Sequence, residues 1–378
     1  MLKPPSLKIG IEEEYLIVDQ ESLDLVAKPD PEFMATCHKL SDGRTTNEYL
    51  QCQIEVGTRP HHLIRDAGRE LADLRLLTRN TAEEYGYGII ASSTHPFATR
   101  REQSYTPKER YKILHRELGL SASRMLICGM HTHLEVEDED LRIDLMNQAA
   151  YFLPHLLALS CSSPYWEGED TSLASYRLAV FDALPRTGLP DNLNSFATFR
   201  RLVDQLVRSG SLEDGSKIWW DIRPSVKFPT IEQRITDVCS LLKDAVAITA
   251  TFQAIVAYLY RLRTLNQRWR RYPPTLINEN RWRAQRYGTD EPLIDHGKTM
   301  LVPFKDLLAE LVELIREDAA GLGTEAELDR VKSISSRGNS TKRQRQRFAQ
   351  AVAEGADKQE ALREVARMLA DDFLSECE

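Results

Sequence analysis

The sequence predicts an α+β fold with a mainly antiparallel sheet of about six strands and helices packed on its outer face. Two observations favour it. Segments in which apolar and polar residues alternate with a period of two are interspersed with helical segments. The two types do not follow one another in the short, regular units of a doubly wound sheet. Several strands also alternate apolar with polar residues, which is typical of a sheet with one buried face and one face lining a cavity.

The expected elements follow the chain in order. The strand segments are Lys8–Val18, Tyr49–Gly57, Tyr87–Ser93, Met125–Val136, Lys217–Arg223 and Thr230–Thr236. The helical segments are His61–Tyr85, Pro107–Leu118, Leu141–Ser160, Leu193–Arg208, Cys239–Thr264, Pro303–Asp318 and Asp357–Phe373. No repeat or linker divides the chain, so we expect a single domain over residues 1–378, with a core of 8–290 and a helical C-terminal extension of 300–378.

The composition of the chain indicates which classes of partner and which cellular compartment are expected. A chain of 378 residues can bury a large core, and its net charge of −8 argues against nucleic-acid binding, which needs a clustered basic excess. The six cysteines form no CxxC pair, so a reduced, cytoplasmic compartment is expected rather than a zinc or disulfide framework. Met1–Leu7 lacks a signal core, and Ala245–Leu259 is too short for a membrane span, so it is predicted to be a buried helix.

Polar side chains share one face on five of the predicted strands. Glu12 and Glu14 alternate with apolar residues on the first strand, and Glu55 does so on the second. The polar faces of the others hold His131, His133 and Glu135, then Asp221 and Arg223, then Glu232 and Arg234. Each strand alone fits a solvent-exposed face. Together they favour a site, because they are rich in acids, histidine and arginine and poor in lysine.

Converging carboxylates require counter-cations. Two carboxylates about 4 Å apart repel by roughly 4 kcal/mol at an effective dielectric near 20. Mg²⁺ can supply this positive charge because it prefers carboxylate oxygens as ligands and leaves coordination positions for water and phosphate. Arginines suit phosphate oxygens through paired hydrogen bonds. A zinc site at His131 and His133 is the alternative, although the surrounding carboxylates favour a hard ion.

Six ordered segments resemble the carboxylate–amine ligase family, also called glutamate–cysteine ligase type 2. They are Ile9–Asp19, Glu48–Thr58, Cys128–Val136, Ser162–Arg177, Trp219–Cys239 and Glu279–Gly288, with a weaker match at Arg337–Arg345. The resemblance implies a glutamine-synthetase-like curved sheet that holds ATP and Mg²⁺, or Mn²⁺, on its open face. It also implies a homodimer that joins an amino-acid carboxylate to an amine, with weak glutamate–cysteine ligase activity giving γ-glutamylcysteine, ADP and phosphate.

The resemblance also implies roles for individual residues. The metal ligands would be Glu12, Glu14, Glu48, Glu55, His131 and Glu232. Arg234 would contact the ATP phosphates and act in catalysis with Glu232 and Glu14. The further cofactor contacts would be Arg223, Thr58 and Arg177. Glu48 breaks the parity of its strand, so we expect it in the preceding turn or at a bulge.

Several interpretations stay open from the sequence. Arg177 would bind a substrate carboxylate or anchor a loop, and Glu135 would crowd the site or face water. Ser335–Arg347 is basic and would be a mobile loop or a phosphate clamp. The helical stripe of Glu279, Arg283 and Arg286 fits a salt-bridged surface or an anion site.

Two other functions compete with the ligase interpretation. A guanidino kinase would stop at phosphoryl transfer, and a catalytically silent protein would only bind a nucleotide or metal. No P-loop or GxGxxG motif is present, so bound ATP must be held by metal ions and arginines.

Overall fold

A seven-stranded sheet forms the centre of the molecule in the computed structural model, which describes residues 3–377. Residues 1, 2 and 378 lie outside the described residues, so the expectation that Met1–Leu7 lacks a signal core falls partly outside them. The strand order is β10-β11-β5-β1-β3-β2, and β4 also pairs with β1. The strands are β1 (Ile9–Asp19), β2 (Thr45–Asn47), β3 (Gln53–Gly57), β4 (Tyr87–Ile90), β5 (Met130–Glu135), β10 (Ile222–Pro224) and β11 (Thr230–Gln233). All these pairings are antiparallel, which confirms the predicted sheet; β2 is the strand that was not predicted.

Strand β1 organises the sheet because it pairs with β3, β4 and β5. Ile9, Ile11 and Tyr15 are fully buried on one of its faces, as the alternation predicts. The register sets polar residues directly opposite one another across strands: Glu14 faces Glu55, and Glu12 faces His131. Residues paired in this way project from the same side of the sheet, so they gather on its open face.

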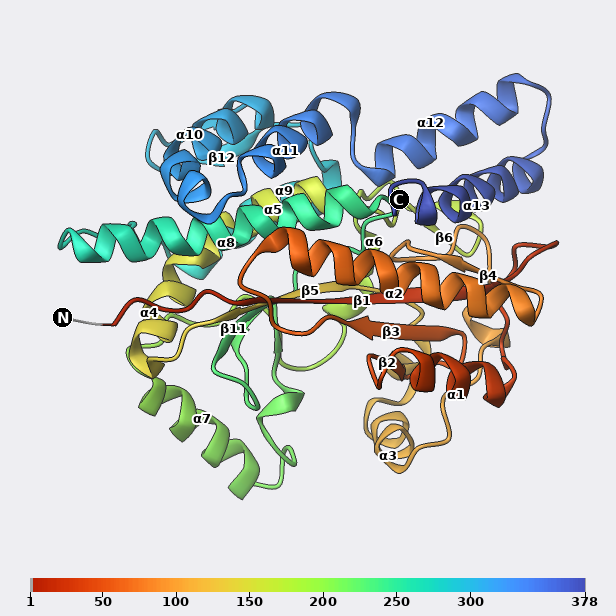
Figure 1. Cartoon of the computed structure of the whole chain (residues 1–378), viewed down its shortest axis with the longest axis horizontal. Helices are drawn as coiled ribbons and strands as arrows, with labels where there is room; N and C mark the ends of the chain where they lie inside the picture. The colour runs from red at the N-terminus through yellow and green to blue at the C-terminus, as the bar shows by residue number, and fades with distance from the viewer. Residues whose placement is uncertain (1–2, 378) are drawn as a thin grey trace.

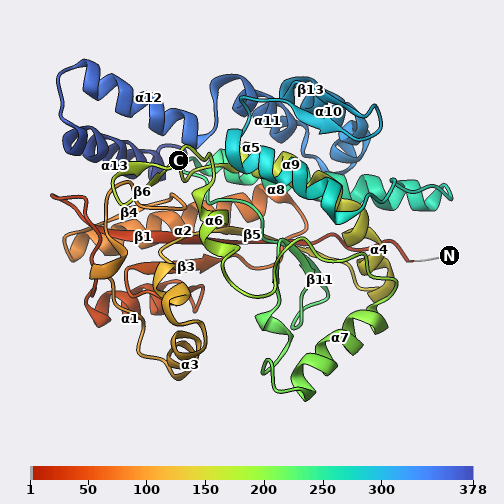
Figure 2. The ribbon, with the colours of Figure 1, turned by 180° about the vertical axis from the view of Figure 1, so that it is seen from behind.

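Helices cover the two faces unequally (Figure 1). Helices α2 (Ile64–Glu84), α8 (Leu242–Thr264) and the C-terminal helices lie on one side, while α3 (Glu109–Leu118) and α7 (Phe196–Arg208) project on the other. Figure 2 shows the same division from behind.

The remaining helices are α1 (Pro31–Leu40), α4 (Glu139–Ala149), α5 (Leu153–Ser160), α6 (Tyr176–Phe181), α9 (Pro274–Tyr287), α10 (Phe304–Leu322), α11 (Glu325–Arg337), α12 (Ser340–Ala353) and α13 (Lys358–Leu374). Short pairs β6–β7 (Tyr165–Trp166, Glu169–Asp170), β8–β9 (Thr187–Gly188, Trp219–Trp220) and β12–β13 (Leu293–Asp295, Met300–Val302) complete the fold.

Helix α8 is long and apolar enough to cross a membrane by length and composition. Its apolar window is nevertheless 72% buried within the fold, where it packs against α2, α10 and α11. This confirms the predicted buried helix at Ala245–Leu259.

Three predicted segments differ from the structure. Lys217–Arg223 is not one strand, because β9 pairs with β8 outside the main sheet and only Ile222 and Arg223 belong to β10; Asp221 between them is buried and pairs with Arg281 instead of lying on a polar face. Leu141–Ser160 is not one helix, because a 3₁₀ turn at Ala150–Phe152 separates α4 from α5, and Pro154 stands in the first turn of α5, where its missing N–H is tolerated. The interpretation of Ser335–Arg347 as a mobile loop was wrong, and its arginines Arg337, Arg343, Arg345 and Arg347 each pair with an acid. The segment forms the end of α11 and the start of α12, because Asn339 caps α12 and Arg343 pairs with Asp372 at 2.5 Å.

Candidate active site

A cavity of about 610 Å³ opens on the uncovered face of the sheet. It is lined by residues of β1, β5 and β11, and also by α3 and the segments around β9 and β10. The lining includes nearly all the residues implied by the resemblance: Glu12, Glu14, Glu48, Glu55, His131, Glu232, Arg177, Arg223 and Arg234. Residues from five separate segments of the sequence therefore meet in one place.

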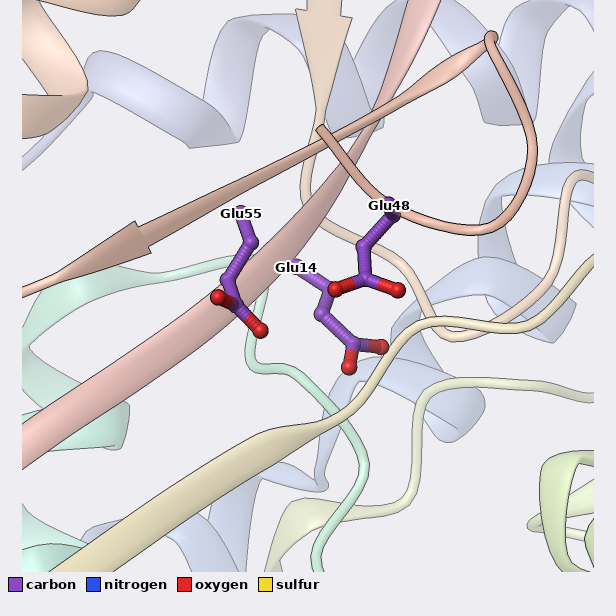
Figure 3. A group of neighbouring side chains, drawn as sticks. All are labelled: Glu14, Glu48 and Glu55. Atoms are coloured by element: carbon purple, nitrogen blue, oxygen red, sulfur yellow. The ribbon is translucent and has the colours of Figure 1, made fainter. Parts of the chain in front are cut away.

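Three carboxylates form the centre of the site (Figure 3). Glu14, Glu48 and Glu55 each place a carboxylate oxygen within 4.8 Å of the others. Glu14 and Glu55 are cross-strand partners, and Glu48 lies in the connection between β2 and β3, which explains its broken strand parity. Within residues 3–377, no ion pair neutralises any of these three carboxylates.

Hydrogen bonds fix the three acids without balancing their charge. The Gly129 N–H donates to Glu14 at 2.7 Å, the Tyr49 N–H donates to Glu48 at 3.1 Å, and the Thr46 hydroxyl donates to Glu55 at 3.0 Å. Burial and then repulsion from Glu14 raise the pKa of Glu48 to about 7. Burial and the charges of Glu48, Glu12 and Glu14 raise the pKa of Glu55 well above its usual value. The arrangement is unfavourable for three ionised acids unless a cation joins them, so this donor set fits a hard divalent ion.

Two histidines flank the neighbouring acid, Glu12. His131 Nδ1 lies 3.4 Å and His133 Nε2 lies 3.3 Å from its two carboxylate oxygens. Burial alone would raise the pKa of Glu12, but the two histidines hold that pKa well below its usual value. His131 is 3% exposed, and its Nε2 has no hydrogen-bond partner among the described residues. A buried imidazole nitrogen without a partner, beside carboxylates, suits a metal ligand.

Glu232 is balanced in a different way. Arg223 donates to both of its carboxylate oxygens at 2.9 Å, and Arg234 also pairs with it. Burial opposes ionisation of Glu232, but the two arginines outweigh it and lower its pKa strongly. Arg234 and Arg223 are thus positioned by Glu232 on one wall of the cavity, where their remaining N–H groups can meet an anion.

Two of the implied cofactor contacts have a structural explanation of their own. Arg177 is 2% exposed and donates to the carbonyls of Arg234 and Ile235 at 3.2 and 3.4 Å, so it anchors this segment although it also lines the cavity. Thr58 is not brought to the cavity: its hydroxyl accepts a hydrogen bond from the Ile11 N–H at 3.0 Å and holds β1 to the end of β3.

The other open interpretations are also resolved by contacts. Glu135 does not line the cavity; it binds Ser6 at 2.6 Å and Lys8 at 3.0 Å at the far end of β5. On α9, Arg283 and Arg286 donate to backbone carbonyls of Pro292 and Ser172. The stripe therefore ties neighbouring segments together.

A buried arginine between the residues of that stripe was not singled out from the sequence. Arg281 is 6% exposed and bridges Asp182 and Asp221 at 2.7 and 2.6 Å. In the sequence, only the position of Arg281 on the inner side of α9 could have distinguished it from the exposed residues near it on the helix.

Sequence reasoning also missed a basic and aromatic rim. The cavity lining includes Lys108, Arg110, Tyr111, Trp219 and Lys227. Arg110 lies over the Tyr111 ring, 4.3 Å from its centroid. Two cations close together at the start of the predicted helix Pro107–Leu118 were the available signal.

Residues 8–367 match the family model described as glutamate-cysteine ligase family 2. The chain belongs to this family. A relative from Rhodospirillum rubrum, named "Putative glutamate--cysteine ligase 2", is 51% identical over 365 residues, covering 96% of this chain and 94% of the relative. A relative of the same name from Ruegeria pomeroyi is also 51% identical over 365 residues, covering 97% and 94%.

Solved structures of low identity show the same fold. Glutamate–cysteine ligase from Francisella tularensis, in complex with AMP, aligns with a TM-score of 0.67 at 16% identity and covers 100% of this chain and 91% of its own. A bifunctional glutathione synthetase from Pasteurella multocida aligns with a TM-score of 0.70 at 15% identity, covering 98% and 53%. This family member therefore has the fold of known ligases.

Proposed function

We propose that this family member is an ATP-dependent carboxylate–amine ligase, with glutamate and cysteine as the first substrate pair to test and γ-glutamylcysteine as the product. The observation that carries the proposal is the group of Glu14, Glu48 and Glu55, three partly buried acids that have no ion pair within residues 3–377. Family membership and the names of the relatives support the ligase reaction.

The residues present fit Mg²⁺, with Mn²⁺ as a substitute. Glu14, Glu48 and Glu55 would hold an ion, and the further ligands would be Glu12, His131 and Glu232. When bound, the metal supplies positive charge that offsets the phosphate oxygens of ATP. The protein contributes the fixed carboxylates and a wall of arginines, so little rearrangement is needed when the anion enters.

The reaction requires two displacements. An oxygen of the acid substrate attacks the γ-phosphorus of ATP, which forms an acyl phosphate and releases ADP. The amine then attacks the acyl carbon, loses a proton and displaces phosphate, leaving an amide. Arg234 and Arg223 would stabilise the charge on the phosphoryl group in the first step, since both lie beside Glu232 on the cavity wall.

We also propose a cytoplasmic homodimer in which each chain acts as one catalytic domain. All six cysteines are free and buried, which suits a reducing compartment. Small-molecule substrates suit a cavity of about 610 Å³.

Measurement of Mg²⁺-dependent ADP release across amino-acid pairs, with mass spectrometry of the products, tests the proposal. The expected result is an amide formed in step with ADP. A phosphorylated guanidino product without an amide would instead identify a kinase, and nucleotide binding without turnover would identify a silent protein. Glu135→Gln is the matched control for site variants, because Glu135 lies on β5 outside the cavity.

A further inference from the structure

A second cavity, of about 350 Å³, lies where α5, the segment after α8, β12 and α10 meet. It shares no lining residue with the candidate active site. Figure 1 shows α8 and α10 on the opposite side of the sheet from α3, which contributes to the active-site wall. A ligand here would be separate from the proposed reaction.

Aromatic rings build the wall of this cavity. Trp269 contacts Phe152 and Tyr151, with ring centroids 5.0 and 5.3 Å apart. Tyr151 in turn packs against Tyr272 at 5.4 Å. Such rings favour offset or edge-on contact with another flat ring, so the wall suits a planar aromatic ligand.

Two buried polar atoms in this wall lack hydrogen-bond partners among residues 3–377. They are the indole nitrogen of Trp269 and Nδ1 of His155, and His155 is only 3% exposed. The indole N–H can only donate, whereas burial lowers the pKa of His155 to about 4, so its neutral ring can donate or accept. Buried polar groups are seldom left without partners, so a heteroaromatic ring with its own donor or acceptor atoms would satisfy this pair.

The rim of the cavity adds positive charge. Arg268 and Arg270 are exposed and line the cavity, and neither has an ion pair in the described part of the chain. Arg270 lies over the Tyr272 ring at 5.1 Å. Lys298 differs, because Asp295 and Glu310 already pair with it at 2.9 and 3.1 Å. The two arginines are therefore available for an anion next to the aromatic wall.

We propose that this cavity binds a small planar aromatic ring that carries an anionic group, either a phosphate or a carboxylate. The ring stacks among Tyr151, Trp269 and Tyr272, the Trp269 N–H donates to a ring acceptor, and Arg268 with Arg270 pairs with the anion. A volume near 350 Å³ suits a ligand the size of a nucleoside monophosphate or an aromatic acid.

Calorimetric titration of the full chain without Mg²⁺ tests this site. AMP and indole-3-acetate are the two probes, and ribose 5-phosphate is the control that lacks the ring. We expect one equivalent of AMP or of indole-3-acetate to bind, and the probe that binds more tightly identifies the source of the anion. Ribose 5-phosphate is expected not to bind.

Variants locate the binding. Trp269→Phe keeps the ring but removes the N–H, and the double variant Arg268→Ala/Arg270→Ala removes the exposed charges; each should weaken binding by about tenfold. Arg316→Ala changes an exposed arginine of α10 outside the cavity and should bind as the parent does. Glu232→Gln, in the active site, should also leave this binding unchanged.

Three results would overturn the proposal. The first is that neither probe binds to saturation. The second is that binding survives both Trp269→Phe and the double arginine variant. The third is that Glu232→Gln abolishes binding, which would assign the probe to the active site. The double arginine variant keeps the experiment decisive if Trp269→Phe fails to fold, because both arginines are exposed. The ligase reaction itself is tested separately, by amide formation.

Discussion

Neighbouring acids on β1 meet opposite electrostatic environments. Glu13 is fully buried in the core, where Arg75 donates to its carboxylate at 2.8 to 3.0 Å and the Tyr15 hydroxyl donates at 2.5 Å. Glu14, the next residue, faces the open side and has the Gly129 N–H as a partner and two further acids, Glu48 and Glu55, as neighbours. One residue step along a strand therefore exchanges a carboxylate with an ion pair for one that has none within residues 3–377.

The difference distinguishes a charge that stabilises the fold from a charge that is available to bind a ligand. Arg75 also donates to the carbonyls of Cys239 and Ser240, so the Glu13 pair joins β1 and α2 to the segment before α8. A partly buried group of acids without such a partner is unfavourable, and a ligand that carries a cation would relieve it. The contrast therefore predicts that changes on the two faces of β1 have different consequences.

The largest effect is expected on the core side. Arg75→Met leaves Glu13 buried without a cation and should lower the free energy of unfolding by about 3–5 kcal/mol in urea titrations. The double variant Arg75→Met/Glu13→Leu should recover most of this loss, because no uncompensated charge remains. A single-variant loss below about 1 kcal/mol would contradict the assigned role of the pair.

On the open side the loss should be one of activity. Glu14→Gln removes a metal ligand and should reduce Mg²⁺-dependent ADP release by about 10²–10³-fold, the scale seen when one electrostatic contact to a developing charge is lost. Its free energy of unfolding should be unchanged or higher, since repulsion within the acid group falls. Full activity in this variant would count against the metal assignment.

A pH difference sharpens the comparison further. Glu48 has a pKa of about 7 in the folded chain against 4.5 ordinarily, so the folded state holds an extra proton between these values. Its stabilising contribution is complete below pH 4.5 and is lost as the pH rises through 7. Without Mg²⁺, the stability of the parent should therefore fall relative to Glu48→Gln by about 1–2 kcal/mol from pH 5 to pH 8, discounting for partial exposure. A constant difference between parent and variant would refute this explanation.

The smallest effect is expected at Thr58. Thr58→Val removes the hydroxyl that accepts from the Ile11 N–H and should lower the free energy of unfolding by about 1 kcal/mol. Because the side chain lies outside the cavity lining, kcat and KM for ATP should stay within about twofold of the parent. A rise in KM for ATP well beyond that would restore Thr58 as a nucleotide contact.

The alternation of strand residues predicted much of the site. Glu12, Glu14, Glu55, His131 and Glu232 lie on the open face as the period of two requires, because the strands in which they were placed are regular. Pairing between distant strands is not encoded in that local pattern. The cross-strand partnership of Glu14 with Glu55 therefore emerged only from the register.

Residues in connections were harder to predict. The rim residues Lys108 and Lys227 reach the cavity from loops, where local periodicity carries no information about direction. The basic segment Ser335–Arg347 was misassigned for a related reason. Its arginines suggest solvent or phosphate, yet Arg337 pairs with Asp244 and Arg343 with Asp372, partners that are distant in sequence or on another helix.

Gly129 limits how this site can be altered. A methyl group there would lie 2.5 Å from Arg177 Nη2 and 3.0 Å from His131 Nε2, so even alanine would displace two groups that the cavity needs in place. Arg177 holds the carbonyl of Arg234, so the displacement would reach the arginine wall as well. Redesign for new acids or amines is consequently better directed at the rim, around Trp219 and Lys227, which line the cavity outside the group of three acids.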